Sequence, residues 1–175
     1  MLGDGKPLLL LSWTRKPRGL VYARIPVLVG CAPGADAAAR AGAPAAQLFR
    51  ASAWRARGLP WPAALAARSV AFVRALSAAG GVLVSAPGRP CPAGLLPGRS
   101  WRSCGSGSWS TLALAAGLAV PLVLFLPPAV SPPAAWGPWS PAPLFVNDQF
   151  TQANASLASP LSGAWLLLPP PRLPL

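Results

Sequence analysis

A short turn rich in glycine and serine is the stretch best suited to chemistry in this sequence. It consists of Gly105, Ser106, Gly107 and Ser108 and precedes an alanine- and leucine-rich run. The two glycines can take backbone angles that are closed to other residues, so successive N–H groups can converge there. With Ser108 as the predicted N-cap, the next helix adds unpaired N–H donors and the positive end of its dipole. The turn therefore predicts an anion site that suits phosphate.

A second polar turn follows the apolar run 25–30, and it contains Gly30, Gly34 and Asp36. Gly34 would allow a ligand to approach the backbone closely. Asp36 lies in the first turn of a predicted helix, where a carboxylate interacts favourably with the helix dipole. Two interpretations stay open for Asp36: a structural role at this helix start, or a contact with a sugar hydroxyl of a ligand.

The charge of the chain is strongly one-sided. Fifteen Lys and Arg face three acidic residues, which gives a formal net charge of +12. Such a balance favours polyanionic partners, either nucleic acid or a membrane surface. A coding bias that enriches Ala, Arg, Gly and Pro together is the alternative explanation. Near the predicted phosphate site, Arg68, Arg89 and Arg102 would supply positive charge.

The residue types that are missing exclude several classes of chemistry. The sequence contains no histidine and no glutamate, which removes most general acid–base catalysis and any Ser-His-Asp or Cys-His site within one chain. Its three cysteines form no C-x-x-C pair, so we expect no metal site and no cofactor. An odd cysteine count without a secretory signal predicts reduced thiols and a cytoplasmic protein.

Short apolar runs predict buried strands, and alanine-rich runs predict helices. The predicted strands cover 25–30, 46–49, 82–84 and 122–126, and the predicted helices cover 35–42, 63–79 and 111–118. This alternation favours an α/β fold with a mostly parallel sheet and flanking helices. We expect 27–29, 82–84 and 122–126 to be parallel neighbours, and ligands to bind beyond the carboxyl ends of the strands.

Several finer expectations concern single elements. Leu8 to Ser12 is interpreted as an edge strand, and Gly117 as the C-cap glycine of the helix over 111–118. The helix over 63–79 should place Arg68 and Arg74 away from its buried face. The buried face should consist of Leu65, Ala66, Val70, Val73 and Leu76.

Two segments outside regular structure also carry interpretations. Trp and Arg alternate in the predicted loop 51–62, a pattern that can stack on bases; a buried Trp beside a solvated Arg is the alternative. The uncharged run 110–126 approaches the length of a membrane span, which is the alternative to a turn, helix and strand there. The chain then divides into a poorly defined segment 1–24, a domain 25–126 and an irregular Pro-rich tail 127–175. That tail would be mostly extended, packing locally through Trp136, Trp139 and Trp165. A helical or strand period is expected in it only at Pro143 to Val146 and Ala164 to Leu168.

Four segments, taken in order, resemble the SLOG superfamily of Rossmann-like proteins. V-G-C-A-P-G-A-D-A-A-A-R at 29–40 is similar to its "GGARGAD" turn. A-A-R-S-V-A-F-V-R-A-L at 66–76 is similar to the "RNR" helix of its smaller members. V-L-V-S-A-P-G-R at 82–89, with Gly88 and Arg89, resembles its "PGG" loop. C-G-S-G-S-W-S-T-L-A-L-A-A-G-L-A-V-P at 104–121 resembles its G-x-G-[ST] turn and "GxPV" run.

The chain departs from the superfamily at three places. The phosphoribohydrolase branch of the LOG family has a glutamate where this chain has Thr111, so the resemblance does not imply that hydrolase activity. Pro33 replaces the usual arginine of the first turn and removes one candidate phosphate contact. The superfamily's first strand is not recognisable in 1–24.

These observations lead to one main hypothesis about function. The chain would be a non-enzymatic protein that binds a nucleotide or nucleotide derivative through its Gly-rich strand-to-helix turns, in a bacterial or phage accessory context. Three alternatives stay open: a single-stranded nucleic-acid binder similar to the DNA-processing protein A family, a small membrane-associated protein built on 110–126, and a chain without a stable fold. Whether the protein forms homo-oligomers is also open.

Overall fold

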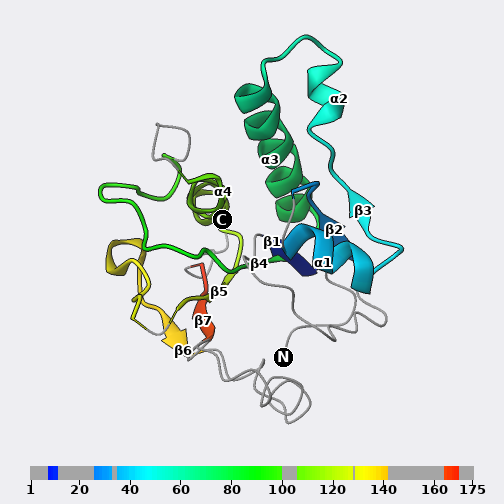
Figure 1. Ribbon diagram of the computed structural model, residues 1–175. Coiled ribbons are helices and arrows are strands. Elements are labelled where there is room, and N and C mark those ends of the chain that lie inside the picture. Colours follow the sequence, from blue (N-terminus) through cyan, green and yellow to red (C-terminus); the bar gives the residue numbers. More distant parts are fainter. Residues whose placement is uncertain are drawn as a thin grey trace, which may run out of the picture.

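The computed structural model describes residues 8–11, 26–32, 35–99, 106–127, 129–141 and 164–169 (Figure 1). The strands are β1 (Leu8–Leu11), β2 (Val27–Val29), β3 (Gln47–Leu48), β4 (Val82–Ser85), β5 (Leu122–Phe125), β6 (Ser140–Pro141) and β7 (Ala164–Leu167). The helices are α1 (Ala35–Gly42), α2 (Ser52–Arg55), α3 (Trp61–Ala78) and α4 (Gly107–Gly117), with a short 3-10 turn η1 (Ala134–Trp136). Strand and helix alternate as predicted, apart from the added helix α2 within the expected loop 51–62.

One sheet joins all of these strands, in the order β3-β2-β1-β4-β5-β7-β6. The five strands from β3 to β5 are parallel to their neighbours, whereas β7 pairs antiparallel with both β5 and β6. The prediction of an α/β chain with a mostly parallel sheet is therefore confirmed.

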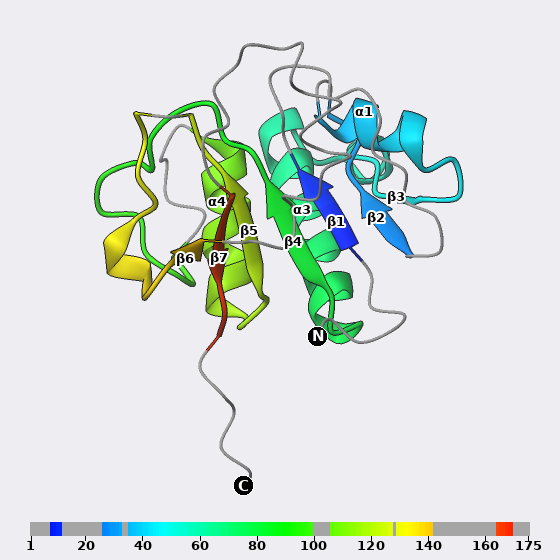
Figure 2. The ribbon, with the colours of Figure 1, turned by 90° about the horizontal axis from the view of Figure 1, so that it is seen from below.

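Alternate strand residues point to opposite faces of the sheet, and both faces are buried. α3 and α4 cover one face, where Phe72 and Leu112 pack against Leu28, Leu83 and Leu122. α1 packs on the opposite face, where Ala39 belongs to a cluster with Val29, Val82, Val84, Val123 and Phe125. Figure 2 shows α3 and α4 together behind the strands. Burial on both faces explains why these strands read as continuous apolar runs.

β1 lies inside the sheet, so the expectation of an edge strand over Leu8 to Ser12 is wrong. Leu8 pairs with Val27 of β2 on one side and with Val82 of β4 on the other. The insertion of β1 also separates 27–29 from 82–84, which were expected to be direct neighbours. The expected parallel pairing of β4 with β5 is confirmed.

The buried face of α3 agrees only in part with the one predicted, because Val73 and Leu76 are buried as expected but the other three predicted residues are not. Its buried side chains are Ala64, Arg68, Ser69, Phe72, Val73 and Leu76. Arg68 thus lies within the buried face, while Leu65, Ala66 and Val70 are only half-buried. Arg74 is exposed, as expected. Arg68 is buried because it forms the ion pair with Asp36 that is described below. The spacing of residues along α3 does not reveal a partner that belongs to another helix.

α4 ends at Gly117, one residue before the predicted end at 118, in a Schellman motif. The Val120 N–H donates to the Ala115 carbonyl at 2.9 Å, and the Ala119 N–H donates to the Ala116 carbonyl at 3.0 Å. Leu118 is the C-cap, and Ala119 takes the left-handed conformation with φ of 54°. The prediction of Gly117 as the C-cap glycine is therefore wrong.

Gly117 has a different structural reason to be glycine. A Cβ placed on it would lie 2.5 Å from both the Cα and the N of Gly98 in the loop after β4. The Gly98 N–H donates to the Ala113 carbonyl of α4 at 2.8 Å, and Gly98 itself has φ of 77°. The two glycines thus let this loop pack directly on the backbone of α4.

Part of the Pro-rich segment 127–175 joins the main core and does not pack only locally. Trp136 is buried, donates its indole N–H to the Leu95 carbonyl at 2.8 Å and meets Trp109 edge to face at 5.8 Å between ring centroids. Trp165 belongs to β7, which pairs with β5. Of the two tail segments in which a helical or strand period was expected, 164–168 contains β7, whereas 143–146 lies outside the described residues.

The segment 110–126 is a helix followed by a strand. α4 ends at Gly117, and β5 begins at Leu122 within the sheet. The alternative of one membrane span over 110–126 is therefore wrong. Of the helices in the described ranges, none combines the length and the apolar character that crossing a bilayer requires.

Candidate functional site

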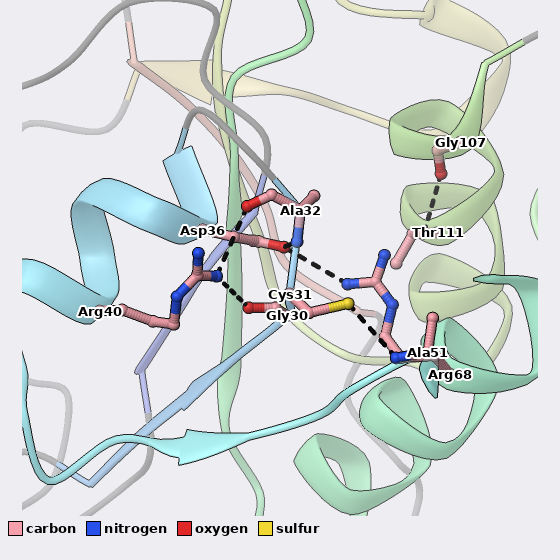
Figure 3. A network of polar contacts seen from close by, with 9 residues as sticks. All are labelled: Gly30, Cys31, Ala32, Asp36, Arg40, Ala51, Arg68, Gly107 and Thr111. Atoms are coloured by element: carbon pink, nitrogen blue, oxygen red, sulfur yellow. Dashed lines mark hydrogen bonds and ion pairs between the residues drawn. The ribbon is translucent and has the colours of Figure 1, made fainter. Parts of the chain in front are cut away.

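Three side chains from two helices, α1 and α3, form a network at the turn after β2 (Figure 3). From α1, Asp36 Oδ2 accepts a hydrogen bond from the Ala32 N–H at 3.0 Å. Also from α1, Arg40 Nη1 donates to the Gly30 carbonyl at 2.6 Å and to the Ala32 carbonyl at 3.4 Å. Arg68 reaches the same carboxylate oxygen from α3. The conformation of the turn after β2 is thus fixed by side chains of α1, one of which is held in turn by Arg68 of α3.

Asp36 and Arg68 form a buried ion pair. Arg68 Nη1 lies 3.3 Å from Asp36 Oδ2, and the two side chains are 8% and 0% exposed. Both residues were predicted as ligand contacts, and the structure brings them together with Gly30. Asp36 lies in the first turn of α1, as predicted.

Gly30 is required by this pair. A Cβ on Gly30 would collide with Arg68 Nη1 and with Asp36 Oδ2. The absence of a side chain lets the carboxylate and the guanidinium meet directly over the backbone at the end of β2. Gly30 therefore serves the ion pair, whereas the sequence suggested contact with a ligand.

Burial raises the pKa of Asp36 above its ordinary value near 3.8. The Ala32 N–H, the charges of Arg68 and Arg40 and the hydrogen bond from Arg68 all act in the opposite direction, but desolvation is the largest effect. The site therefore favours the protonated form of Asp36 more than water does, although Arg68, Arg40 and the Ala32 N–H stabilise the ionised form.

Two residues of this network were missed by the sequence reasoning. Arg40 lies in the last turn of α1, four residues after Asp36, so one helix face presents both groups to the turn. The spacing of four residues between Asp36 and Arg40 therefore indicates, from the sequence alone, that both side chains face the same way. Cys31 Sγ accepts a hydrogen bond from the Ala51 N–H at 3.3 Å, which ties the turn to the chain entering α2. No local sequence pattern predicts that contact.

The start of α4 differs from the prediction in its cap. Ser106 is the N-cap, and its Oγ accepts from the Trp109 N–H at 3.4 Å, so the assignment of Ser108 as N-cap is wrong. The first intrahelical bond is donated by the Ser110 N–H to the Ser106 carbonyl at 3.0 Å. The N–H groups of Gly107 and Ser108 precede that bond, as expected for the open end of a helix.

Gly107 needs no special backbone angle. Its φ is not among the positive values, and a Cβ added there would meet nothing within 4 Å. The expectation that Gly107 uses backbone angles closed to other residues is therefore wrong. Because Gly107 is exposed, its position tolerates other side chains, and it becomes a convenient place for substitutions.

The loop after β4 is joined to the start of α4. The Trp109 indole N–H donates to the Arg89 carbonyl at 2.9 Å, and Trp109 is fully buried. Gly88 and Arg89 are exposed in this loop. These two predicted contacts therefore lie beside Ser106 to Ser108, whereas Gly30, Asp36 and Arg68 form a separate group. Gly34, Arg102 and Gly105 lie outside the described residues.

Three buried polar side-chain atoms have no hydrogen-bond partner within the described part of the chain. They are Asp36 Oδ1, Arg68 Nε and Ser85 Oγ. Ser85 is the last residue of β4 and pairs with Leu11 of β1 and Leu124 of β5. Since side chains alternate along a strand, Ser85 points to the same face as Leu83, the face covered by α3 and α4.

Thr111 is the residue that the resemblance to the LOG family would align with a glutamate. Its Oγ1 donates to the Gly107 carbonyl at 2.8 Å, and its side chain is buried. The hydroxyl is therefore engaged within α4. Among the described residues, no group of three or more His, Cys, Asp or Glu side chains is placed to hold a metal ion.

Comparison with known proteins gives no match for this chain among protein-family models, curated proteins or solved structures.

Proposed function

We propose that this chain is a non-enzymatic, cytoplasmic protein of SLOG type that binds a nucleotide or nucleotide derivative at the carboxyl edge of a Rossmann-like sheet. Its strands β3, β2, β1, β4 and β5 are parallel and follow the order 3-2-1-4-5. The chain moves from β1 outward to β3 and then returns to β4 on the other side of β1. In sheets of this kind, ligands bind where the strand order reverses, beyond the carboxyl ends.

The observation that carries the proposal is the position of the unpartnered buried atoms. Asp36 Oδ1, Arg68 Nε and Ser85 Oγ belong to residues at the carboxyl edge of the parallel strands. Ser85 ends β4, directly beside β1, at the point of reversal. Buried polar groups are normally paired, so an edge that gathers three unpaired ones is suited to a polar ligand.

We expect the phosphate group of the ligand to bind at the start of α4. The N–H groups of Gly107 and Ser108 and the helix dipole favour an anion there. Exposed Arg89 lies in the adjoining loop, which the Trp109 indole holds against α4. Of the Asp36 carboxylate, Oδ2 is committed to Ala32 and Arg68, which leaves Oδ1 as the acceptor for a sugar hydroxyl.

The absence of histidine and glutamate supports a binding role rather than catalysis. At the position of the LOG glutamate, the Thr111 hydroxyl is bonded to its own helix. Release of a free base when the protein is incubated with a nucleoside monophosphate would contradict this part of the proposal.

Titration calorimetry of the full chain tests the proposal with three ligands: a nucleoside monophosphate, the matching nucleoside and inorganic phosphate. We expect the monophosphate to bind most tightly, because it alone carries both a phosphate for the start of α4 and a sugar hydroxyl for Asp36. Gly107→Glu should abolish phosphate-dependent binding through charge repulsion. The same carboxylate interacts favourably with the helix dipole, so the fold should persist.

Gly107→Ala is the matched control, because position 107 has room for a Cβ and the substitution adds no charge. It should bind like the natural protein. Asp36→Asn should weaken the monophosphate more than inorganic phosphate. Equal affinity in folded Gly107→Glu and Gly107→Ala would place phosphate somewhere other than the start of α4.

A further inference from the structure

Helix α2, the residues on either side of it and the first residue of α3 form a basic and aromatic corner, defined here as residues 50–61. Three of its side chains are exposed arginines, Arg50, Arg55 and Arg57. Trp61, the first residue of α3, is 51% exposed, and Trp54 is half-buried. Tryptophan is normally a well-buried residue, so half-exposed Trp61 among arginines needs a reason beyond packing.

The corner projects because α3 is much longer than the strands it covers. Eighteen residues of helix span about 27 Å, whereas four-residue strands span about 13 Å. α3 connects β3 to the parallel strand β4, so it must begin near the carboxyl edge of the sheet and run back. Its first buried side chain is Ala64, and the turn before it extends past the sheet. Figure 1 shows α2 and the start of α3 standing away from the strands.

The corner is held in shape by its backbone. The Ala56 N–H donates to the Ser52 carbonyl at 2.9 Å, the Gly58 N–H to Arg55 at 2.9 Å and the Leu59 N–H to Trp54 at 3.3 Å. Gly58 takes φ of 85°, which suits glycine. The Ala51 N–H bonds to Cys31 and anchors the corner to the sheet. Its side chains are therefore presented from a folded support rather than from a loose loop.

The arginines of the corner have no acidic partner among the described residues. The one acidic side chain in those ranges is Asp36, which is fully buried and paired with Arg68. The first turn of α3 contains no acidic residue, and its N-cap is Pro60 without a side-chain cap. Three exposed guanidinium groups and an open helix start thus add positive potential that no acidic side chain of the described ranges compensates locally.

We propose that the α2–α3 corner binds single-stranded nucleic acid, independently of the nucleotide site. Arg50, Arg55 and Arg57 would contact successive phosphates, and Trp61 would stack on an unpaired base. This combination of cations along a backbone with an exposed aromatic face is the usual means of binding single strands without sequence preference. Arginine is well suited to it because guanidinium binds phosphate in a bidentate manner.

A lipid bilayer fits the corner less well. Insertion requires several exposed apolar side chains, but Trp61 is the one large hydrophobic residue that is exposed between 50 and 61. Leu59 and Trp54 are half-buried instead. Stacking uses a single aromatic face, which the corner has.

The test is fluorescence anisotropy of a labelled oligothymidine strand over a range of salt concentrations. Each phosphate contact to a single strand contributes about 0.7 to the slope of log K against log salt. The double variant Arg55→Gln/Arg57→Gln should therefore lower that slope by about 1.4. Trp61→Ala should weaken binding roughly 5- to 150-fold with an unchanged slope, and Trp61→Phe should retain most of the affinity.

The matched control is Arg74→Gln/Arg99→Gln, which removes the same charge from two exposed arginines outside the corner. We expect this variant to bind nearly like the natural protein. An equal loss in both double variants would overturn the proposal, because net charge alone would then explain binding. So would equal affinity for duplex DNA with no effect of Trp61→Ala, or corner-dependent binding to anionic phospholipid vesicles without binding to oligothymidine.

Discussion

Arg68 Nη1 lies 3.3 Å from Asp36 Oδ2, and the pair meets directly over Gly30 at the end of β2. The contact joins α3 to α1 although these helices pack on opposite faces of the sheet. It can form only beyond the end of a strand, where side chains from the two faces can reach each other. This ion pair therefore fixes the edge of the sheet at which we propose that the ligand binds.

Gly30→Ala should destabilise the protein by about 1–3 kcal/mol, because the added methyl group would separate the pair. Arg68→Ala alone should cost about 3–5 kcal/mol, since it leaves the buried carboxylate of Asp36 unpaired. Urea unfolding of both single variants and the double variant provides a cycle. The double variant should lose less than the sum, because the collision with Arg68 Nη1 disappears once Arg68 is removed and only the one with Asp36 Oδ2 remains. Strict additivity would show that Gly30 is not constrained by Arg68.

The pKa of Asp36 predicts how stability changes with pH. Because burial raises this pKa, the folded protein takes up a proton at a higher pH than the unfolded chain does. The stability linked to this group is complete below its unfolded pKa and is lost as pH rises through the folded pKa. Measured by urea unfolding from about pH 7 to about pH 4, the natural protein should gain stability relative to Asp36→Asn. A relative loss over that range would mean that the two arginines outweigh desolvation.

The strands and the first helix were predictable because their signals are local. Val27–Val29 and Leu122–Phe125 are uninterrupted apolar runs, and Ala35–Gly42 is rich in alanine. The internal position of β1 was also readable, since four consecutive leucines indicate a strand covered on both faces. The prediction of an edge strand over Leu8 to Ser12 did not take this run of leucines into account.

The site was less predictable because its decisive contacts are distant in sequence. Arg68 is separated from Asp36 by 32 positions in the sequence. In a sequence-based reading of a helix, an arginine is assigned to the exposed face because charged side chains are rarely buried. Ser106 and Ser108 are equally good N-caps by residue type, and the choice depends on where α4 packs. The reason for Gly117 is Gly98, which belongs to another segment.

Gly117→Ala should destabilise the protein by about 1–3 kcal/mol, because its Cβ would lie 2.5 Å from two backbone atoms of Gly98. Backbone atoms cannot rotate away as a flexible side chain can. Gly107→Ala, at the other end of the same helix, has open space and should be neutral or slightly stabilising. Thermal unfolding followed by circular dichroism compares the two directly. Similar melting temperatures would show that the loop after β4 yields freely around α4.

Ala119→Gly should stabilise the protein by about 1 kcal/mol. Ala119 holds φ of 54° at the position where Schellman motifs normally have glycine, and a left-handed conformation costs an L-residue about 1–2 kcal/mol. The greater freedom of glycine in the unfolded chain offsets part of that gain. Ala116→Gly, inside α4 three residues earlier, is the matched control and should destabilise by about 0.5–1 kcal/mol. Opposite signs for these two identical substitutions in urea unfolding would establish the left-handed end of α4, whereas a loss in both would exclude it.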